Sequence, residues 1–166
     1  MNEDINNLKK LLDIIPKNHP ALRVAHFSDR DTILVDLLED IASKQDLEYQ
    51  LNITDISLYD KIAQKTNPNT KLIKFNLNRP KYMIQGKLYD FVLVTCETKK
   101  LDDFLQKVHS IIKNAGNIIF LLPKSSDTKL YEELLEKNYF VATSIMDDLL
   151  SDELVLISRK MHGWGG

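Results

Sequence analysis

Polar side chains that could bind a ligand follow the apolar segments of this chain at several points. They are Ser28-Asp29-Arg30-Asp31, Asp55, Asn76, Asn78 and Thr95-Cys96-Glu97. If the apolar segments before them are parallel strands, these side chains gather at one edge of a sheet. Open α/β sheets bind ligands beyond the carboxyl ends of their strands, where the strand order reverses. The pattern therefore predicts a small-molecule cleft at that edge.

The reactive groups in this set have structural alternatives. Cys96 could act as a nucleophile, but no His or Lys beside it in the sequence would lower the pKa of its thiol, so a structural cysteine is favoured. Glu97 could serve as a general base or could be an acid at the start of a helix. The four histidines are scattered and show no zinc-ligand spacing, so we expect no metal site.

Glycine is scarce in this chain of 166 residues. Three of the five glycines lie in the last four residues, and only Gly86 and Gly116 remain for the body. A phosphate-binding loop and a G-x-G-x-x-G dinucleotide loop both need several glycines at a turn between a strand and a helix. Both kinds of site are therefore excluded.

Helices and strands alternate along the sequence according to its hydrophobic periodicity. Helices are expected at 5–15, 34–42, 56–65, 101–112 and 127–137, and strands at 22–27, 47–53, 71–77, 88–95, 117–122, 139–146 and 153–160. Gly116 is expected to end the helix that begins at Leu101. This alternation predicts an α/β domain with a mostly parallel seven-stranded sheet. The last two strands have no room for a crossover helix, so they are expected to pair antiparallel.

Four short segments resemble class I S-adenosylmethionine-dependent methyltransferases. Leu88-Tyr89-Asp90-Phe91-Val92-Leu93-Val94-Thr95 is similar to their fourth strand, and Ile111–Ile119 to their "L-kpGG-l-v" stretch. Asp55-Ile56-Ser57 resembles the end of their second strand, and Leu135–Phe140 the segment that leads into their sixth. The resemblance runs from about Leu22 to Met161. It implies a three-layer Rossmann-like fold in one domain over residues 1–161. The apolar spacing at 5–15 predicts an N-terminal helix and lead-in over residues 1–20. Residues 162–166 are expected to be a flexible tail, whose Trp164 could alternatively dock on a partner or a second copy.

The resemblance also implies a set of cofactor-binding residues. Asp55 would accept hydrogen bonds from both ribose hydroxyls, although it could equally cap the next helix. Asn76 or Asn78 would stand near the adenine amino group, although turn or strand-end roles compete. The other residues at this edge are Phe27, Ser28, Asp29, Asp31 and Thr95.

The first of these turns departs from the family pattern. The family has two or three glycines there, because a Cβ would block close backbone approach to the methionine part of the cofactor. This chain has Phe27-Ser28-Asp29-Arg30-Asp31 instead. The two carboxylates could bind the cofactor's ammonium group, but they would repel its carboxylate. This loop indicates weakened S-adenosylmethionine binding.

Three functions follow from these observations. The first is a divergent methyltransferase-like protein with a degenerate cofactor site and no ordinary catalysis, which binds S-adenosylmethionine weakly or binds another small molecule. The second is an active methyltransferase with an unusual loop, acting on a small molecule or RNA. The third is a protein-interaction module, for which a homodimer is one expectation.

The charge distribution bears on the partners. Seven bases and no acid lie between Lys61 and Lys87, in a chain whose net charge is −2. This run is either a solvated face or a patch for RNA or another anion. The N-terminus is polar, no apolar run could span a membrane and there is one cysteine, so a cytoplasmic location without membrane contact is expected.

Overall fold

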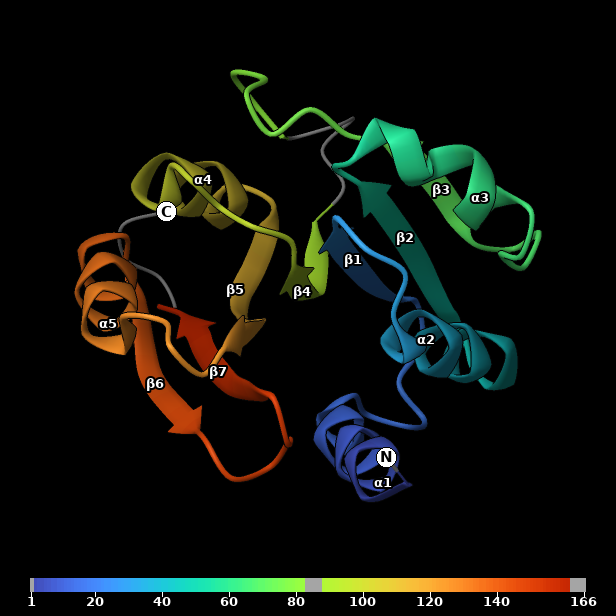
Figure 1. The fold of residues 1–166 in the computed structure, drawn as a ribbon, viewed down its shortest axis with the longest axis horizontal. Coiled ribbons are helices and arrows are strands. Elements are labelled where there is room, and N and C mark those ends of the chain that lie inside the picture. The colour runs from blue at the N-terminus through green and yellow to red at the C-terminus, as the bar shows by residue number, and fades with distance from the viewer. Residues whose placement is uncertain (1, 83–87, 162–166) are drawn as a thin grey trace.

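The computed structural model describes residues 2–82 and 88–161 and shows an α/β fold (Figure 1). The helices are α1 (Asn2–Leu11), α2 (Ile33–Lys44), α3 (Tyr59–Ala63), α4 (Leu101–His109) and α5 (Thr128–Lys137), with 3-10 turns η1 (Leu12–Ile14) and η2 (Ile56–Leu58). The strands are β1 (Leu22–Ser28), β2 (Leu47–Ile53), β3 (Lys71–Lys74), β4 (Tyr89–Thr95), β5 (Ile112–Pro123), β6 (Phe140–Met146) and β7 (Glu153–Lys160).

The seven strands form one sheet in the order β3-β2-β1-β4-β5-β7-β6. The first five of these are parallel, while β7 runs antiparallel to both β5 and β6. The mostly parallel sheet and its C-terminal antiparallel pair were both predicted. The chain leaves β1 toward β2 on one side and returns to β4 on the other, so the strand order reverses between β1 and β4. This is the position at which open α/β sheets bind ligands.

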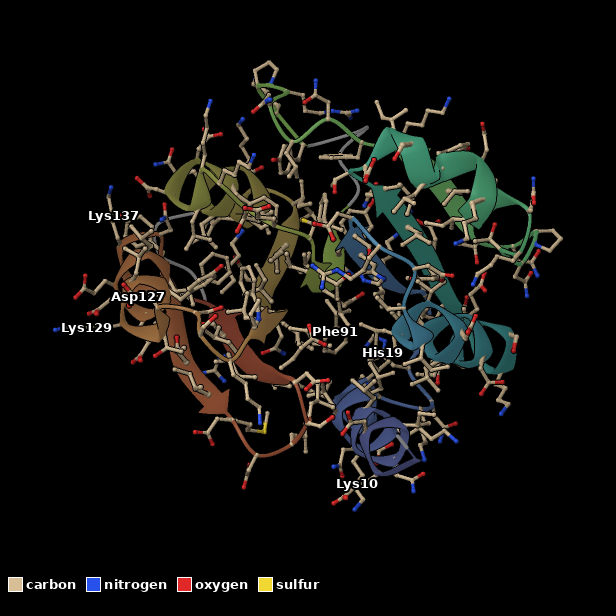
Figure 2. The ribbon with its side chains drawn as sticks, viewed as in Figure 1. Lys10, His19, Phe91, Asp127, Lys129 and Lys137 are labelled. Carbon is tan, nitrogen blue, oxygen red and sulfur yellow. The ribbon has the colours of Figure 1, made fainter. Side chains whose placement is uncertain are left out.

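Two apolar cores cover the two faces of the sheet and give the fold three layers. On one face α1, the turn η1 and α2 contribute Leu8, Leu12, Leu34 and Leu38 to a core with the inner side chains of β1, β2 and β4. On the other face α4 and α5 contribute Leu101, Phe104, Leu105 and Leu135. Asp127 caps α5 by accepting the Leu130 N–H at 3.1 Å, and Lys137 at its other end pairs with Asp102 of α4 at 2.8 Å (Figure 2). Among the described residues between β3 and β4 there is no helix.

The connection between β6 and β7 packs onto the N-terminal helix. Leu150 is buried in the core beneath α1, and Asp4 accepts hydrogen bonds from the Ser151 backbone and hydroxyl. Asn7 donates to the Leu149 carbonyl at 2.7 Å. The apolar pair Leu149-Leu150 therefore anchors an otherwise acidic loop to the domain.

The prediction for Gly116 was wrong. Helix α4 ends at His109, and Gly116 lies inside β5, where the ladder to β4 shifts register between Tyr89 and Phe91. A Cβ on Gly116 would lie 2.6 Å from Ile112 Cγ2 and 2.9 Å from the Asp90 carbonyl oxygen. Close approach of the backbone, rather than a helix end, is therefore what requires glycine here. The apolar pair at 111–112 continued the helical periodicity, although Ile112 already begins the strand.

Candidate functional site

A cleft of about 630 Å³ lies beyond the carboxyl ends of β1, β2, β3 and β4. One wall is the segment after β3, and the other is the segment that leads into α4. Its size falls within the range of roughly 300–1,000 Å³ that is typical of small-molecule sites. Its lining residues are Asp29, Thr54, Ile56, Phe75, Asn76, Leu77, Asn78, Tyr82, Glu97, Thr98, Lys99, Lys100, Asp103 and Phe104. The predicted edge of the sheet therefore carries a cleft.

Aromatic rings form the apolar side of this cleft. Phe75, Tyr82 and Phe104 line it, and all three pack against Phe27, at ring-centroid distances of 5.0, 5.8 and 5.6 Å. The Tyr82 hydroxyl donates to the Leu77 carbonyl at 2.7 Å, which holds the segment after β3 in place. Phe27 itself is 1% exposed. It therefore supports the rings from below and does not line the cleft.

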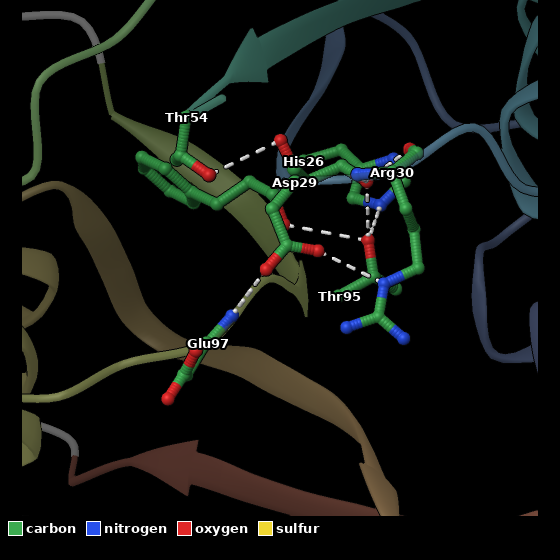
Figure 3. A network of polar contacts seen from close by, with 8 residues as sticks. His26, Asp29, Arg30, Thr54, Thr95 and Glu97 are labelled. Carbon is green, nitrogen blue, oxygen red and sulfur yellow. Dashed lines mark hydrogen bonds and ion pairs between the residues drawn. The ribbon is translucent and has the colours of Figure 1, made fainter. Parts of the chain in front are cut away.

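A buried chain of hydrogen bonds lies beneath the loop that follows β1 (Figure 3). His26 Nδ1 is 2.7 Å from the Tyr49 hydroxyl, and His26 Nε2 is 2.7 Å from Thr95 Oγ1. Thr95 Oγ1 donates to Ser28 Oγ at 2.8 Å, and Ser28 Oγ donates to the Arg30 carbonyl at 2.7 Å. The chain connects the interior of the sheet to the backbone of the loop.

The direction of these bonds fixes the state of His26. Because the Thr95 proton points to Ser28, Thr95 Oγ1 must accept from His26, so Nε2 carries the ring proton. Nδ1 then accepts from Tyr49. A neutral ring satisfies both contacts, and burial lowers the pKa of His26 to about 3. Ser28 and Thr95 are therefore buried supports of the loop, since neither lines the cleft.

Asp29 crosses the cleft floor between β1 and β4. Its Oδ2 accepts the backbone N–H of Glu97 at 2.8 Å, and its Oδ1 accepts Arg30 Nε at 2.9 Å (Figure 3). The Asp29 side chain is 26% exposed and the Arg30 side chain 50% exposed. Both carboxylate oxygens therefore have donors within the protein.

The other two predicted carboxylates lie apart from this bridge. Asp31 does not line the cleft and is ion-paired with Lys65. Asp55 caps the turn η2, where Oδ1 accepts the Ser57 N–H at 3.1 Å and the Ser57 hydroxyl at 2.6 Å. The capping role considered for Asp55 is therefore present. Asp55 is exposed but does not line the cleft, unlike its neighbours Thr54 and Ile56.

The two predicted amides line the cleft after β3, in a turn. Asn76 Oδ1 accepts the Asn78 N–H at 2.9 Å, and the Asn76 carbonyl accepts the Arg79 N–H at 3.2 Å. The carbonyl oxygen of the Asn76 side chain therefore stabilises the turn. Asn78 is exposed at the cleft.

The reactive groups after β4 differ in exposure. Cys96 is 5% exposed, and burial raises the pKa of its thiol to about 12, which removes it as a nucleophile. Glu97 is exposed at the cleft. Among the described residues, no three His, Cys, Asp or Glu side chains gather in a group that could hold a metal ion.

Several cleft residues were not predicted. Thr54 directly precedes Asp55, and Ile56 directly follows it, with 62% of its surface exposed. Ile56 stands in the quoted Asp55-Ile56-Ser57 motif, so the sequence held a signal for it. Tyr82 and the start of α4 gave no such signal, because only the folded chain brings them to the same edge.

Most of the basic run is already engaged within the protein. Lys65 pairs with Asp31, and Lys71 pairs with Glu48 at 2.7 Å. Lys74 lies 4.8 Å from the centre of the Tyr59 ring, and Arg79 lies 4.3 Å from that of Phe75. Lys87 and the Trp164 tail fall outside the described residues. No described helix is long and apolar enough to cross a membrane.

Comparisons with known proteins define the fold. No family model and no curated protein matches the chain. Solved structures do match it. The C-methyltransferase domain of the citrinin polyketide synthase has a TM-score of 0.74 at 13% identity, over 93% of this chain and 50% of that one. A TehB-like S-adenosylmethionine-dependent methyltransferase from Corynebacterium glutamicum has a TM-score of 0.71 at 15% identity, over 93% and 87%.

A third structure matches over almost its whole length. It is described as an S-adenosylmethionine-dependent methyltransferase from Listeria monocytogenes, and its TM-score is 0.69 at 14% identity, over 97% of this chain and 99% of that one. The strand order of the sheet and these matches agree with the resemblance found in the sequence. This chain therefore has the fold of the class I S-adenosylmethionine-dependent methyltransferases.

Proposed function

We propose that this chain is a divergent methyltransferase-fold protein that binds a small molecule in the cleft and does not carry out ordinary methyl transfer from S-adenosylmethionine. The observation that supports this most strongly is the hydrogen bond from the Glu97 N–H to the Asp29 carboxylate, at 2.8 Å across the cleft floor. The Asp29 side chain lies in the loop after β1, where the methionine part of S-adenosylmethionine would need space.

The nucleoside part of S-adenosylmethionine fits the cleft. Ile56 and Leu77 offer apolar surface for a ring. Asp55, which precedes Ile56 in the sequence, has an exposed carboxylate able to accept hydroxyl hydrogen bonds. The volume of about 630 Å³ is ample for a nucleoside.

The methionine part does not fit the loop after β1. Glycine would let a ligand approach the backbone there, but this loop carries the side chains of Asp29 and Arg30, which pair with each other at 2.9 Å. The loop is also held from below, because Ser28 Oγ donates to the Arg30 carbonyl at 2.7 Å. The loop therefore has little freedom to move aside for a second carboxylate, which Asp29 would repel.

Isothermal titration calorimetry with S-adenosylmethionine and S-adenosylhomocysteine tests this function. The wild-type protein is expected to bind either compound with a Kd weaker than about 1 mM. A submillimolar Kd for either compound would overturn the proposal, and turnover of a methyl acceptor would then favour an active methyltransferase with an atypical loop.

A further inference from the structure

Resting on the function above, we propose that Asp29 is a built-in substitute for a ligand carboxylate, so that the cleft selects nucleosides without an amino-acid tail. The ligand class is a nucleoside or a nucleoside thioether whose 5′ end carries no carboxylate. The part of the cleft that would hold the nucleoside thus remains able to bind, while the part that would hold the amino-acid tail does not.

The contacts of Asp29 are those that a bound carboxylate would make. Its two oxygens accept one backbone N–H, from Glu97 at 2.8 Å, and one guanidinium N–H, from Arg30 at 2.9 Å. Backbone amides and guanidinium groups are the donors by which proteins capture carboxylates. Of these two donors only the Glu97 N–H belongs to a residue that lines the cleft, and Asp29 already occupies it, so a ligand carboxylate would have to displace Asp29 to reach that N–H.

The buried hydrogen-bond chain keeps Asp29 in that place. Ser28 Oγ bonds both the carbonyl and the N–H of Arg30, at 2.7 and 3.3 Å. Ser28 is in turn fixed by Thr95, and Thr95 by His26. Asp29 therefore lies between Ser28, which is buried, and Arg30, whose backbone N–H and carbonyl are both hydrogen-bonded to Ser28 Oγ. Its carboxylate is thus oriented before any ligand binds.

Net charge alone does not explain the expected selectivity. Lys99 and Lys100 also line the cleft, where the chain leads into α4, beside the acidic residues Glu97 and Asp103. Asp103 is paired with Lys107 at 2.7 Å. The selectivity comes instead from the Glu97 N–H, which Asp29 occupies where β1 and β4 end at the cleft.

The rest of the cleft is suited to a ring that carries hydroxyl groups. Phe75, Tyr82 and Phe104 line it but are each only 3% exposed, while Ile56, which also lines it, is 62% exposed. Burial of the exposed Ile56 side chain against a flat ring is favourable. Asp55 does not line the cleft, but it adjoins Ile56 in the sequence and its exposed carboxylate is able to accept from the hydroxyls.

A matched pair of ligands tests this inference. 5′-Methylthioadenosine and S-adenosylhomocysteine share the nucleoside and the thioether sulfur, and differ in whether that sulfur carries a methyl group or the amino-acid chain. Titration calorimetry of the wild-type protein is expected to show methylthioadenosine binding at least about ten-fold more tightly. In Asp29→Ala the affinity for S-adenosylhomocysteine should rise at least about ten-fold, because the Glu97 N–H becomes available and the repelling carboxylate is gone. The affinity for methylthioadenosine should stay within about two-fold.

Asp31→Ala is the control variant, because it removes a carboxylate from the same loop at a position outside the cleft. It should leave both affinities unchanged. Asp29→Asn is the second variant, should Asp29→Ala fail to fold. It keeps an oxygen acceptor for the Glu97 N–H without the charge, and should give a smaller gain for S-adenosylhomocysteine.

The outcomes separate the two proposals. If neither ligand binds the wild-type protein or Asp29→Ala at millimolar concentration, the nucleoside assignment is overturned while the proposed function stands. If methylthioadenosine binds but neither Asp29 variant gains affinity for S-adenosylhomocysteine, the role of Asp29 is overturned. Submillimolar binding of S-adenosylhomocysteine by the wild-type protein would overturn the proposed function itself.

Discussion

Thr95 Oγ1 lies 2.7 Å from His26 Nε2 and 2.8 Å from Ser28 Oγ, at the buried ends of β4 and β1. Its single hydroxyl accepts from the ring and donates to the serine, which gives the chain from Tyr49 to the Arg30 carbonyl one direction. Such a chain stabilises the fold only if each member has its partner, because an unpaired buried polar group costs free energy.

Replacing Thr95 tests the contribution of this chain. Thr95→Val keeps the shape but leaves the His26 Nε2–H without its acceptor and Ser28 without its donor. We expect the free energy of unfolding, measured by urea denaturation, to fall by about 1–3 kcal/mol. Thr95→Ser keeps the hydroxyl and should lose less than Thr95→Val. Equal stability of the valine variant and the wild-type protein would show that the chain adds nothing net.

The burial of His26 predicts a loss of stability in acid. The ring is neutral in the folded protein, where its pKa is lowered to about 3, while the unfolded ring takes up a proton near its ordinary pKa of 6.5. As the pH falls below that value, the unfolded state binds the proton and the folded state does not. Between about pH 7 and pH 5, His26 should therefore remove about 2 kcal/mol from the free energy of unfolding.

His109 adds a loss of the same sign, because burial lowers its pKa to about 4. NMR distinguishes the titration of the two rings. It should show the His26 ring neutral, with the proton on Nε2, down to about pH 5. His26→Gln should have a shallower dependence of stability on pH. A His26 ring that titrates near its ordinary pKa would contradict the buried arrangement.

The close backbone contact at Gly116 predicts that even a methyl group is too large. Gly116→Ala places a Cβ against Ile112 Cγ2 and two backbone carbonyls, and should lower the free energy of unfolding by about 1–3 kcal/mol. Ala115→Gly is the natural control, because Ala115 has φ 66°, a conformation that glycine adopts without strain. It should be neutral or stabilising. Thermal unfolding of the two variants gives the comparison, and a harmless Gly116→Ala would contradict the contact.

Much of the fold could be predicted from hydrophobic periodicity. The strand expected at 47–53 has those bounds in the structure, and the strand expected at 153–160 does too. Errors arose where an apolar pattern fits both a helix and a strand. The helix that begins at Leu101 was expected to run to Ile112, but it ends at His109 and Ile112 begins β5. The prediction that Gly116 ends a helix also failed, because residues other than glycine, such as Ala115 and Tyr139, adopt positive φ angles here.

The site was predicted only as an edge of the sheet. The sequence placed Asp29, Asn76 and Asn78 there, and all three line the cleft. It could not show that Asp29 reaches the Glu97 N–H, because those residues are 68 positions apart and meet only through the pairing of β1 with β4. The role of His26 was hidden for the same reason.

The exchange rate of the Glu97 amide proton tests most directly whether Asp29 closes the cleft floor. NMR hydrogen exchange should find this amide protected in the wild-type protein, and at least about ten-fold faster to exchange in Asp29→Ala. Asp31→Ala, which alters the same loop outside the cleft, should leave the rate unchanged. An amide that exchanges at the same rate in Asp29→Ala and in the wild-type protein would contradict the account.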